Sequence, residues 1–204
     1  NRSGPGLRTP KLLGHGRVGT NGAFVVLEPL PHEAQHIHLD EASWADFGLP
    51  CKQQFSSEIR HVTRYEIEQQ PWWRQYQQRS CQVPHFHADV LAVLNFPVPV
   101  ARTHGDFLGH NFRRVGDQIW VFDWEEYTDC GPHLVDEIGF FLCVYRYGLN
   151  KSVQDVNQLF VENYLRGGEE KRRDTVLALA FLFGANIAMA QNIVFLWQPL
   201  SPNM

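Results

Sequence analysis

Apolar residues along the 204-residue chain follow two different spacings. Short apolar runs at 12–13, 23–31 and 119–122, each ended by glycine, proline or aspartate, predict buried β-strands. Longer stretches with apolar residues three or four positions apart predict helices. These stretches are residues 56–70 (with Ser56 or Ser57 as the N-cap), 72–79, 87–96, 133–149 and 152–167. The pattern predicts an α+β protein that is mainly helical, with a β-hairpin inserted at 111–125 and a remnant of sheet near the start.

Residues 176–197 form the longest apolar segment and contain no charged side chain. The segment is long enough to cross a bilayer. However, Gly184 and three amides, Asn186, Gln191 and Asn192, lie in its middle and second half, where a lipid-exposed helix would hold them at a cost. We therefore interpret 176–197 as a buried helix of the core. Membrane attachment through this segment is the alternative.

Residues 14–19, GHGRVG, match the spacing G-x-G-x-x-G of many nucleotide-binding loops. Glycine lacks a Cβ, so such loops can bring backbone N–H groups close to phosphate oxygens. A dinucleotide-binding loop needs a strand before it and a helix directly after it. Here only thirteen residues precede Gly14, and an apolar strand follows. We interpret these glycines as a turn between two strands, without phosphate contact.

Composition and charge exclude some function classes. The net charge is −4 and no extended basic run occurs, which argues against nucleic-acid binding. The four cysteines are widely spaced without a C-x-x-C pair, which predicts free thiols and a reducing, cytoplasmic compartment. The ten histidines do not combine with cysteines at structural-zinc spacing, so we interpret them as loop and surface residues.

The stretch from Thr103 to Gly139 holds the residues with the clearest chemical potential. His104 and Asp106 are followed by Asn111, and an apolar hairpin strand then ends at Asp123. Phosphoryl transfer needs a metal ion held against the phosphates and a carboxylate beside the attacking hydroxyl. Mg²⁺ prefers oxygen ligands, and a hairpin between Asn111 and Asp123 can return the second ligand beside the first. Asp106 could then orient the acceptor hydroxyl and take its proton.

The sequence HGDFLGHN…VFDWE resembles the catalytic core of the aminoglycoside phosphotransferase and choline kinase family, relatives of the protein kinases. The resemblance implies a protein-kinase-like fold, with ATP and Mg²⁺ as cofactors. It implies that Asp106 is the catalytic base and that Asn111 and Asp123 are magnesium ligands. His104 corresponds to the residue that braces the loop, and Asp136 to an aspartate that opens the next helix and supports the loop.

The segment FVVLEPLP, residues 24–31, resembles the hinge of this family, where backbone groups meet the adenine edge. The resemblance makes the Glu28 carbonyl and the Leu30 N–H the candidate adenine contacts. It also implies two parts, a remnant of N-lobe strands with the hinge at 1–30 and a helical C-lobe with the catalytic hairpin at 31–204. Only 23 residues precede Phe24, and Lys11 lies before the glycines, whereas the family places its phosphate-binding lysine after them. We therefore expect a missing N-terminal segment or a partner subunit.

Two functional hypotheses follow. The first is an ATP-dependent phosphotransferase that acts on a hydroxyl of a small molecule, such as an aminoglycoside, a choline-like compound or a sugar. Glu125 and Glu126 could suit a cationic acceptor, and Trp72 and Trp73 could stack on a sugar or a quaternary amine. The second hypothesis is an inactive kinase-like fold that serves as a structural or interaction subunit of a larger assembly.

Overall fold

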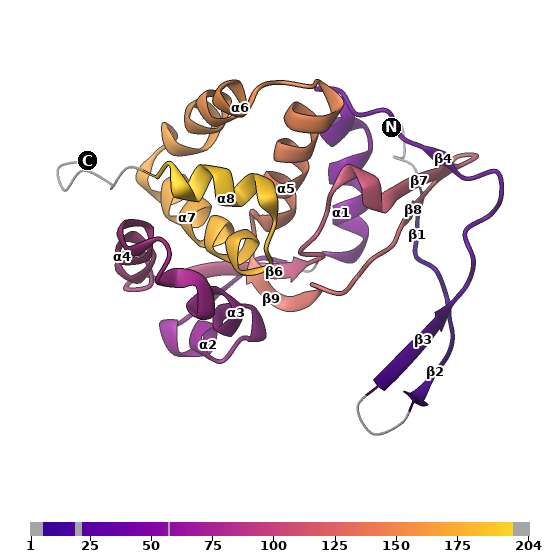
Figure 1. The fold of residues 1–204 in the computed structure, drawn as a ribbon, viewed down its shortest axis with the longest axis horizontal. Helices are drawn as coiled ribbons and strands as arrows, with labels where there is room; N and C mark the ends of the chain where they lie inside the picture. The colour runs from indigo at the N-terminus through magenta and orange to yellow at the C-terminus, as the bar shows by residue number, and fades with distance from the viewer. Residues whose placement is uncertain (1–5, 19–21, 57, 198–204) are drawn as a thin grey trace.

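The computed structural model describes residues 6–18, 22–56 and 58–197 (Figure 1). It is a mixed α+β structure with a helical body and three small sheets. The α-helices are α1 (Leu49–Phe55), α2 (Arg64–Glu68), α3 (Pro71–Ser80), α4 (Pro84–Val93), α5 (Val135–Cys143), α6 (Val153–Phe160), α7 (Glu169–Gly184) and α8 (Ala188–Phe195). Three π-helical turns, η1 (Trp44–Gly48), η3 (Val144–Gly148) and η4 (Val161–Leu165), precede α1 and extend α5 and α6.

The sheets are short, and strands β6 and β7 of two of them flank the HGDFLGHN motif in the chain. One has the order β1 (Gly6–Arg8), β8 (Gln118–Val121), β7 (Phe112–Val115) and β4 (Gln35–His36). A second has the order β5 (Arg60–Val62), β6 (Val98–Thr103) and β9 (Thr128–Pro132). The third is the hairpin of β2 (Leu12–Val18) and β3 (Gly22–Leu27). The predicted mid-chain hairpin is confirmed, since β7 and β8 pair antiparallel from Phe112↔Val121 to Val115↔Gln118.

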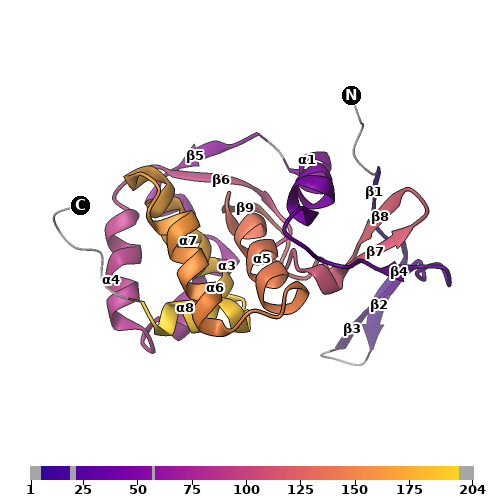
Figure 2. The same ribbon diagram turned by 90° about the horizontal axis from the view of Figure 1, so that it is seen from above.

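Helix α7 runs through the middle of the helical body (Figure 2). Residues 175–184 are all buried, because α3, α4, α5 and α8 pack around the helix. A helix that is apolar on every side is stable only in such surroundings. Gly184 permits the closest approach, since a Cβ there would lie 2.8 Å from the backbone nitrogen of Tyr76.

A second, aromatic core lies between η1, α5 and the residues that follow β6. It consists of Trp44, Phe47, Phe107, Phe112 and Phe140, with the ring centroids of Phe107 and Phe112 4.6 Å apart. Edge-to-face pairs of this kind add stability beyond their buried area. This cluster anchors the segment that carries Asp106.

The predicted helix at 56–70 is wrong in its first half. Residues 60–62 form strand β5 instead, which pairs with β6, and the helix begins after Thr63. A capping box explains the start: the Thr63 N–H donates to Glu66 Oε2 at 2.8 Å, and the Thr63 hydroxyl accepts from the Glu66 N–H. Pairing with a neighbouring strand thus overrides the helical spacing of Ile59 and Val62. Ser57, one of the two expected N-caps, lies outside the described residues.

The expected single helix at 176–197 is also wrong. The chain forms two helices, α7 and α8, with a break at 185–187. Asn186 has φ +65°, a conformation that asparagine tolerates better than most residues. Its side-chain oxygen accepts hydrogen bonds from Gln191 and Arg79, which stabilises the break. Within the described part of the chain, no helix combines the length and apolar character that a membrane span requires.

Residues 14–18 of the glycine-rich segment are strand and not a turn. Gly14 and Gly16 lie within strand β2, opposite Val26 and Phe24 of β3, while Gly19 lies outside the described residues. Backbone pairing with the apolar run of β3 therefore extends the strand through the glycines. The resulting hairpin projects away from the helical body (Figure 1).

Candidate active site

Strand β6 delivers the site loop, residues 104–111, from the middle of its sheet. His104 opens this loop and is fully buried. Its Nε2 donates to the Phe122 carbonyl at 3.1 Å, and its Nδ1 accepts from the Asp106 N–H at 3.3 Å. These partners assign the proton to Nε2 and suit the neutral imidazole. Burial lowers the pKa of His104, against the raising effect of Asp136, and so favours the same form.

The contacts of His104 are those of a bracing residue. Its ring lies 4.3 Å from the Trp124 ring and 5.6 Å from the Phe107 ring, measured between centroids. The imidazole thereby joins the start of the site loop to the end of the β7–β8 hairpin. Because it is buried and both ring nitrogens have hydrogen-bond partners, we interpret His104 as a residue that holds Asp106 in place.

Asp136, in the first turn of α5, supports the loop from beneath. Its Oδ2 accepts from the His104 N–H at 3.2 Å, and its Oδ1 accepts from the Gly105 N–H at 3.0 Å. The supporting role expected for this residue is confirmed. Lys52 Nζ lies 3.8 Å from Asp136 Oδ2 and donates to the His133 carbonyl at 2.7 Å. Sequence reasoning missed Lys52, a single lysine in α1 without any motif around it.

Asp106 and Asn111 hold one another across the loop. The Asn111 Nδ2 group donates to the Asp106 carbonyl and to Asp106 Oδ2, each at 2.9 Å. The other carboxylate oxygen, Asp106 Oδ1, is buried and has no hydrogen-bond partner among the described residues. A buried carboxylate oxygen without a partner is costly. The Asp106 side chain as a whole is 18% exposed and lines a cavity.

Asp123 is brought to Asn111 by the β7–β8 hairpin. The Phe122 N–H donates to the Asn111 carbonyl at 3.2 Å, so the backbone just before Asp123 is bonded to that of Asn111. Asp123 has φ +65° and an exposed side chain. Such a backbone conformation in a residue other than glycine is often found at functional sites. The structure thus brings Asp106, Asn111 and Asp123 into one region.

Glu126, two residues after Trp124, adds a further carboxylate to this region. Its pKa is raised by burial, and the negative charges of Asp106, Glu125 and Asp123 contribute to the same shift. The region therefore repels additional negative charge and attracts cations. Among the described residues, no three His, Cys, Asp or Glu side chains converge on one point. The expected magnesium ligands include an amide, Asn111, together with the carboxylate of Asp123.

Gly105 is needed for the tight contact between the site loop and Glu126. It has φ +86°, and a Cβ there would lie 2.5 Å from the Glu126 carbonyl oxygen. We expect Gly105→Ala to lower the free energy of unfolding by about 2–4 kcal/mol, from the left-handed backbone and the clash together. Gly116→Ala is the matched control, because Gly116 has φ +56° with open space around its Cβ position. The control should lose about 1–2 kcal/mol. Urea unfolding measures both, and equal losses would contradict the clash.

The candidate adenine contacts lie elsewhere in the structure. Glu28 follows β3; its Oε1 accepts from Arg8 at 2.8 Å, and its N–H donates to the Lys11 carbonyl at 2.8 Å. Leu30 is exposed at 37%. Asp106 lines a cavity of about 750 Å³, and neither Glu28 nor Leu30 is among the residues that line it. The structure therefore does not bring these two residues together with the Asp106 group around that cavity.

The suggested stacking role of Trp72 and Trp73 does not fit their positions. Both side chains are buried in the helical core, and Trp72 Nε1 donates to the Cys130 carbonyl at 3.0 Å. The Trp72 ring packs against Phe181 of α7, with centroids 5.4 Å apart. The two residues follow Pro71 in the first turn of α3, and their side chains pack into the core.

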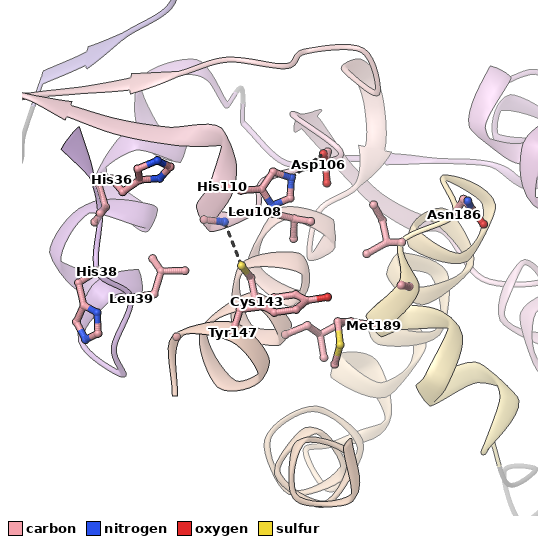
Figure 3. Close-up of a pocket in the computed structure, with 16 residues that line it drawn as sticks. His36, His38, Leu39, Asp106, Leu108, His110, Cys143, Tyr147, Asn186 and Met189 are labelled. Atoms are coloured by element: carbon pink, nitrogen blue, oxygen red, sulfur yellow. Dashed lines mark hydrogen bonds and ion pairs between the residues drawn. The ribbon is translucent and has the colours of Figure 1, made fainter. Parts of the chain in front are cut away.

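A cavity of about 750 Å³ opens beside Asp106 (Figure 3). Asp106 and His110 lie at one end of it, His36 and His38 on one side, and Asn186 and Met189 on the other. Its size falls in the range of small-molecule sites. Sequence reasoning missed its lining because β4, the site loop, the end of α5 and the start of α8 are far apart in the chain. Of the lining residues, only Asp106 had been predicted from the sequence as a site residue.

The similarity of this chain to known proteins is low. No protein-family model matches the chain, and no curated protein matches it. A crystal structure of a choline/ethanolamine kinase family protein from Mesorhizobium loti superposes with a TM-score of 0.44 at 17% sequence identity. The match covers 86% of this chain and 63% of that protein, so the chain spans less than two thirds of it.

Proposed function

We propose that the protein is an ATP-dependent phosphotransferase that transfers the γ-phosphoryl group to a hydroxyl of a small molecule. The observation that carries this proposal is the state of the Asp106 carboxylate. Asn111 holds Oδ2 at 2.9 Å, and the Asp106 side chain, 18% exposed, lines a cavity of ligand size. A carboxylate oriented in this way can accept a hydroxyl proton.

The proposed reaction needs little covalent help from the protein. The acceptor oxygen bonds to the γ-phosphorus, the bond to the bridging oxygen of ADP breaks, and the hydroxyl proton passes to the Asp106 carboxylate. Asn111 holds the Asp106 carboxylate through a hydrogen bond to Oδ2. The His104 ring holds the Asp106 backbone by accepting a hydrogen bond from its N–H. Asp136 holds the start of the loop through two backbone N–H groups. Positioning of this kind supplies most of the catalysis in phosphoryl transfer.

The residues around Asp123 fit a magnesium ion in their donor chemistry. The Asp123 carboxylate and the Asn111 amide offer hard oxygen ligands, and the acidic surroundings that raise the pKa of Glu126 favour a divalent cation. When bound, Mg²⁺ would neutralise charge on the phosphates.

Nucleotide binding tests this proposal most directly. We expect Mg²⁺-ATP at ten times its dissociation constant to raise the melting temperature by about 3–6 °C. Asp123→Asn should lose most of this shift, because it removes one negative ligand while asparagine tolerates the positive φ. Asp117→Asn, an exposed change at the far end of the same hairpin, should keep the full shift. Differential scanning fluorimetry with ATP, with and without Mg²⁺, gives the comparison.

One observation favours the second hypothesis of a structural or interaction subunit. The β2–β3 hairpin exposes Leu12, Leu13 and Val25 at 59–62% each, and such apolar exposure suits a protein contact. In that case millimolar Mg²⁺-ATP would leave the melting temperature unchanged in the wild type and in both variants. That result would overturn the phosphotransferase proposal.

A further inference from the structure

The cavity beside Asp106 has firmly built walls. Leu39 packs against two glycines: a Cβ on Gly109 would lie 2.1 Å from Leu39 Cδ1, and one on Gly148 would lie 2.5 Å from the Leu39 carbonyl oxygen. The Gly109 N–H also donates to Cys143 Sγ at 3.2 Å. These contacts hold the segment after β4, the site loop and the α5–η3 helix together. The cavity is therefore a feature of the packed fold.

Most of the cavity surface is apolar. Its aliphatic and thioether side chains are Ile37, Leu39, Leu108, Leu142, Ile187 and Met189. They come from the segment after β4, the site loop, α5 and the start of α8, so apolar groups face the cavity from several directions (Figure 3). A ligand that fills this space gains by covering the apolar walls.

The charged groups of the lining are few. Asp106 is the only carboxylate that lines the cavity within the described chain, and the lining includes no lysine or arginine there. Its other polar side chains are the imidazoles of His36, His38 and His110, the Tyr147 hydroxyl and the Asn186 amide. An imidazole carries a positive charge or none, so these groups do not attract a cation. A single exposed tyrosine also falls short of an aromatic cage for a quaternary ammonium group.

We infer that this cavity binds the phosphoryl acceptor and that the acceptor is an uncharged, largely apolar alcohol, in place of an aminoglycoside or a choline-like cation. The inference rests on the proposed function, because it takes Asp106 as the base. The reacting hydroxyl would meet the Asp106 carboxylate, the apolar part would lie against the aliphatic walls, and polar groups elsewhere on the acceptor would reach His36 and His38 on one side of the cavity. A cation in this space would either stay unpaired, at a large desolvation cost, or occupy the carboxylate that must take the proton.

A matched series of acceptors tests the inference. The compounds are 1,8-octanediol, 8-amino-1-octanol and 8-hydroxyoctanoate, which share a chain length and differ in the charge at one end. We expect the diol to bind at least about tenfold more tightly than the amino alcohol, by isothermal titration calorimetry. With Mg²⁺-ATP, the diol should also be phosphorylated faster than the amino alcohol, as measured by ³¹P NMR of the phosphomonoester.

Two substitutions tie the binding to this cavity. Ala188 and His38 are exposed residues of the lining, so Ala188→Trp and His38→Trp should fold and fill part of the space. Each should weaken diol binding at least about tenfold. Ala45→Trp is the control, since Ala45 is also exposed and helical but does not line the cavity. Circular dichroism confirms folding, and one folded cavity variant suffices for the comparison.

The outcomes separate the two proposals. If Mg²⁺-ATP stabilises the protein but the amino alcohol binds as tightly as the diol, or neither binds, the uncharged acceptor is wrong and the phosphotransferase proposal stands. If the diol binds in the cavity while Mg²⁺-ATP gives no shift, the phosphotransferase proposal fails, and the acceptor role fails with it. Diol binding that Ala188→Trp and His38→Trp leave intact overturns the assignment of this cavity.

Discussion

Asp106→Asn is expected to lower kcat for phosphoryl transfer by about 10³-fold, the usual contribution of a general base. The amide has nearly the same shape as the carboxylate and can still accept from Asn111 Nδ2, but it cannot take a proton from the acceptor. Asn111 holds one oxygen of this side chain, and the other has no hydrogen-bond partner in the described part of the chain, so the change removes the base with little disturbance of the loop. Initial rates of phosphomonoester formation with 1,8-octanediol and Mg²⁺-ATP measure the effect.

The same variant should keep most of its nucleotide binding. Its Mg²⁺-ATP melting shift should be close to that of the wild type, because Asp123 and Asn111 remain. Asp117→Asn again serves as the control for the rate, since it changes an aspartate to asparagine away from the site loop. A variant at position 106 that turns over at the wild-type rate would exclude Asp106 as the base.

Asp136→Ala is expected to lower the free energy of unfolding by about 3–5 kcal/mol, because it breaks a buried charged network. The Asp136 side chain is fully buried and accepts from two backbone N–H groups of the site loop. Its loss leaves both donors without that partner and leaves Lys52, 12% exposed, without its nearby carboxylate. Chemical denaturation of the wild type and the variant gives the difference.

A second variant separates the charge of Asp136 from its hydrogen bonds. Asp136→Asn keeps an oxygen for one backbone N–H but removes the charge opposite Lys52. Its free energy of unfolding should therefore lie between those of the wild type and the alanine variant. Asp117→Ala, at an exposed turn position, should cost less than about 0.5 kcal/mol. A loss below about 1 kcal/mol for Asp136→Ala would contradict the supporting role.

The carboxylates near Asp106 bear on the chemical class of the phosphoryl acceptor. Glu125 and Glu126 had suggested a cationic acceptor, but neither lines the cavity beside Asp106. Instead, the pKa of Glu126 is raised by burial and by the charges of Asp106, Glu125 and Asp123. These carboxylates are better suited to a metal ion than to the organic part of the acceptor. The apolar walls and the carboxylates thus serve different parts of the proposed reaction.

The sequence by itself determined the features that depend on short-range order. The β7–β8 hairpin follows from two apolar runs around Gly116, which adopts the positive φ of a turn. The grouping of Asp106, Asn111 and Asp123 follows from that hairpin, because its two strands return the chain to its starting point. The support of the loop by Asp136 came from the family resemblance, and its two hydrogen bonds confirm it.

Only the tertiary structure decided which local preferences prevailed. Residues 60–62 were predicted as helix, but pairing with β6 makes them a strand. The C-terminal apolar segment is divided into α7 and α8 at Asn186, whose side chain accepts a hydrogen bond from Gln191. The cavity is assembled from segments as distant as His36 and Met189, and Lys52 reaches Asp136 across 84 positions of sequence. Contacts over such separations depend on how whole elements pack, and the spacing of residues within one element does not contain that information.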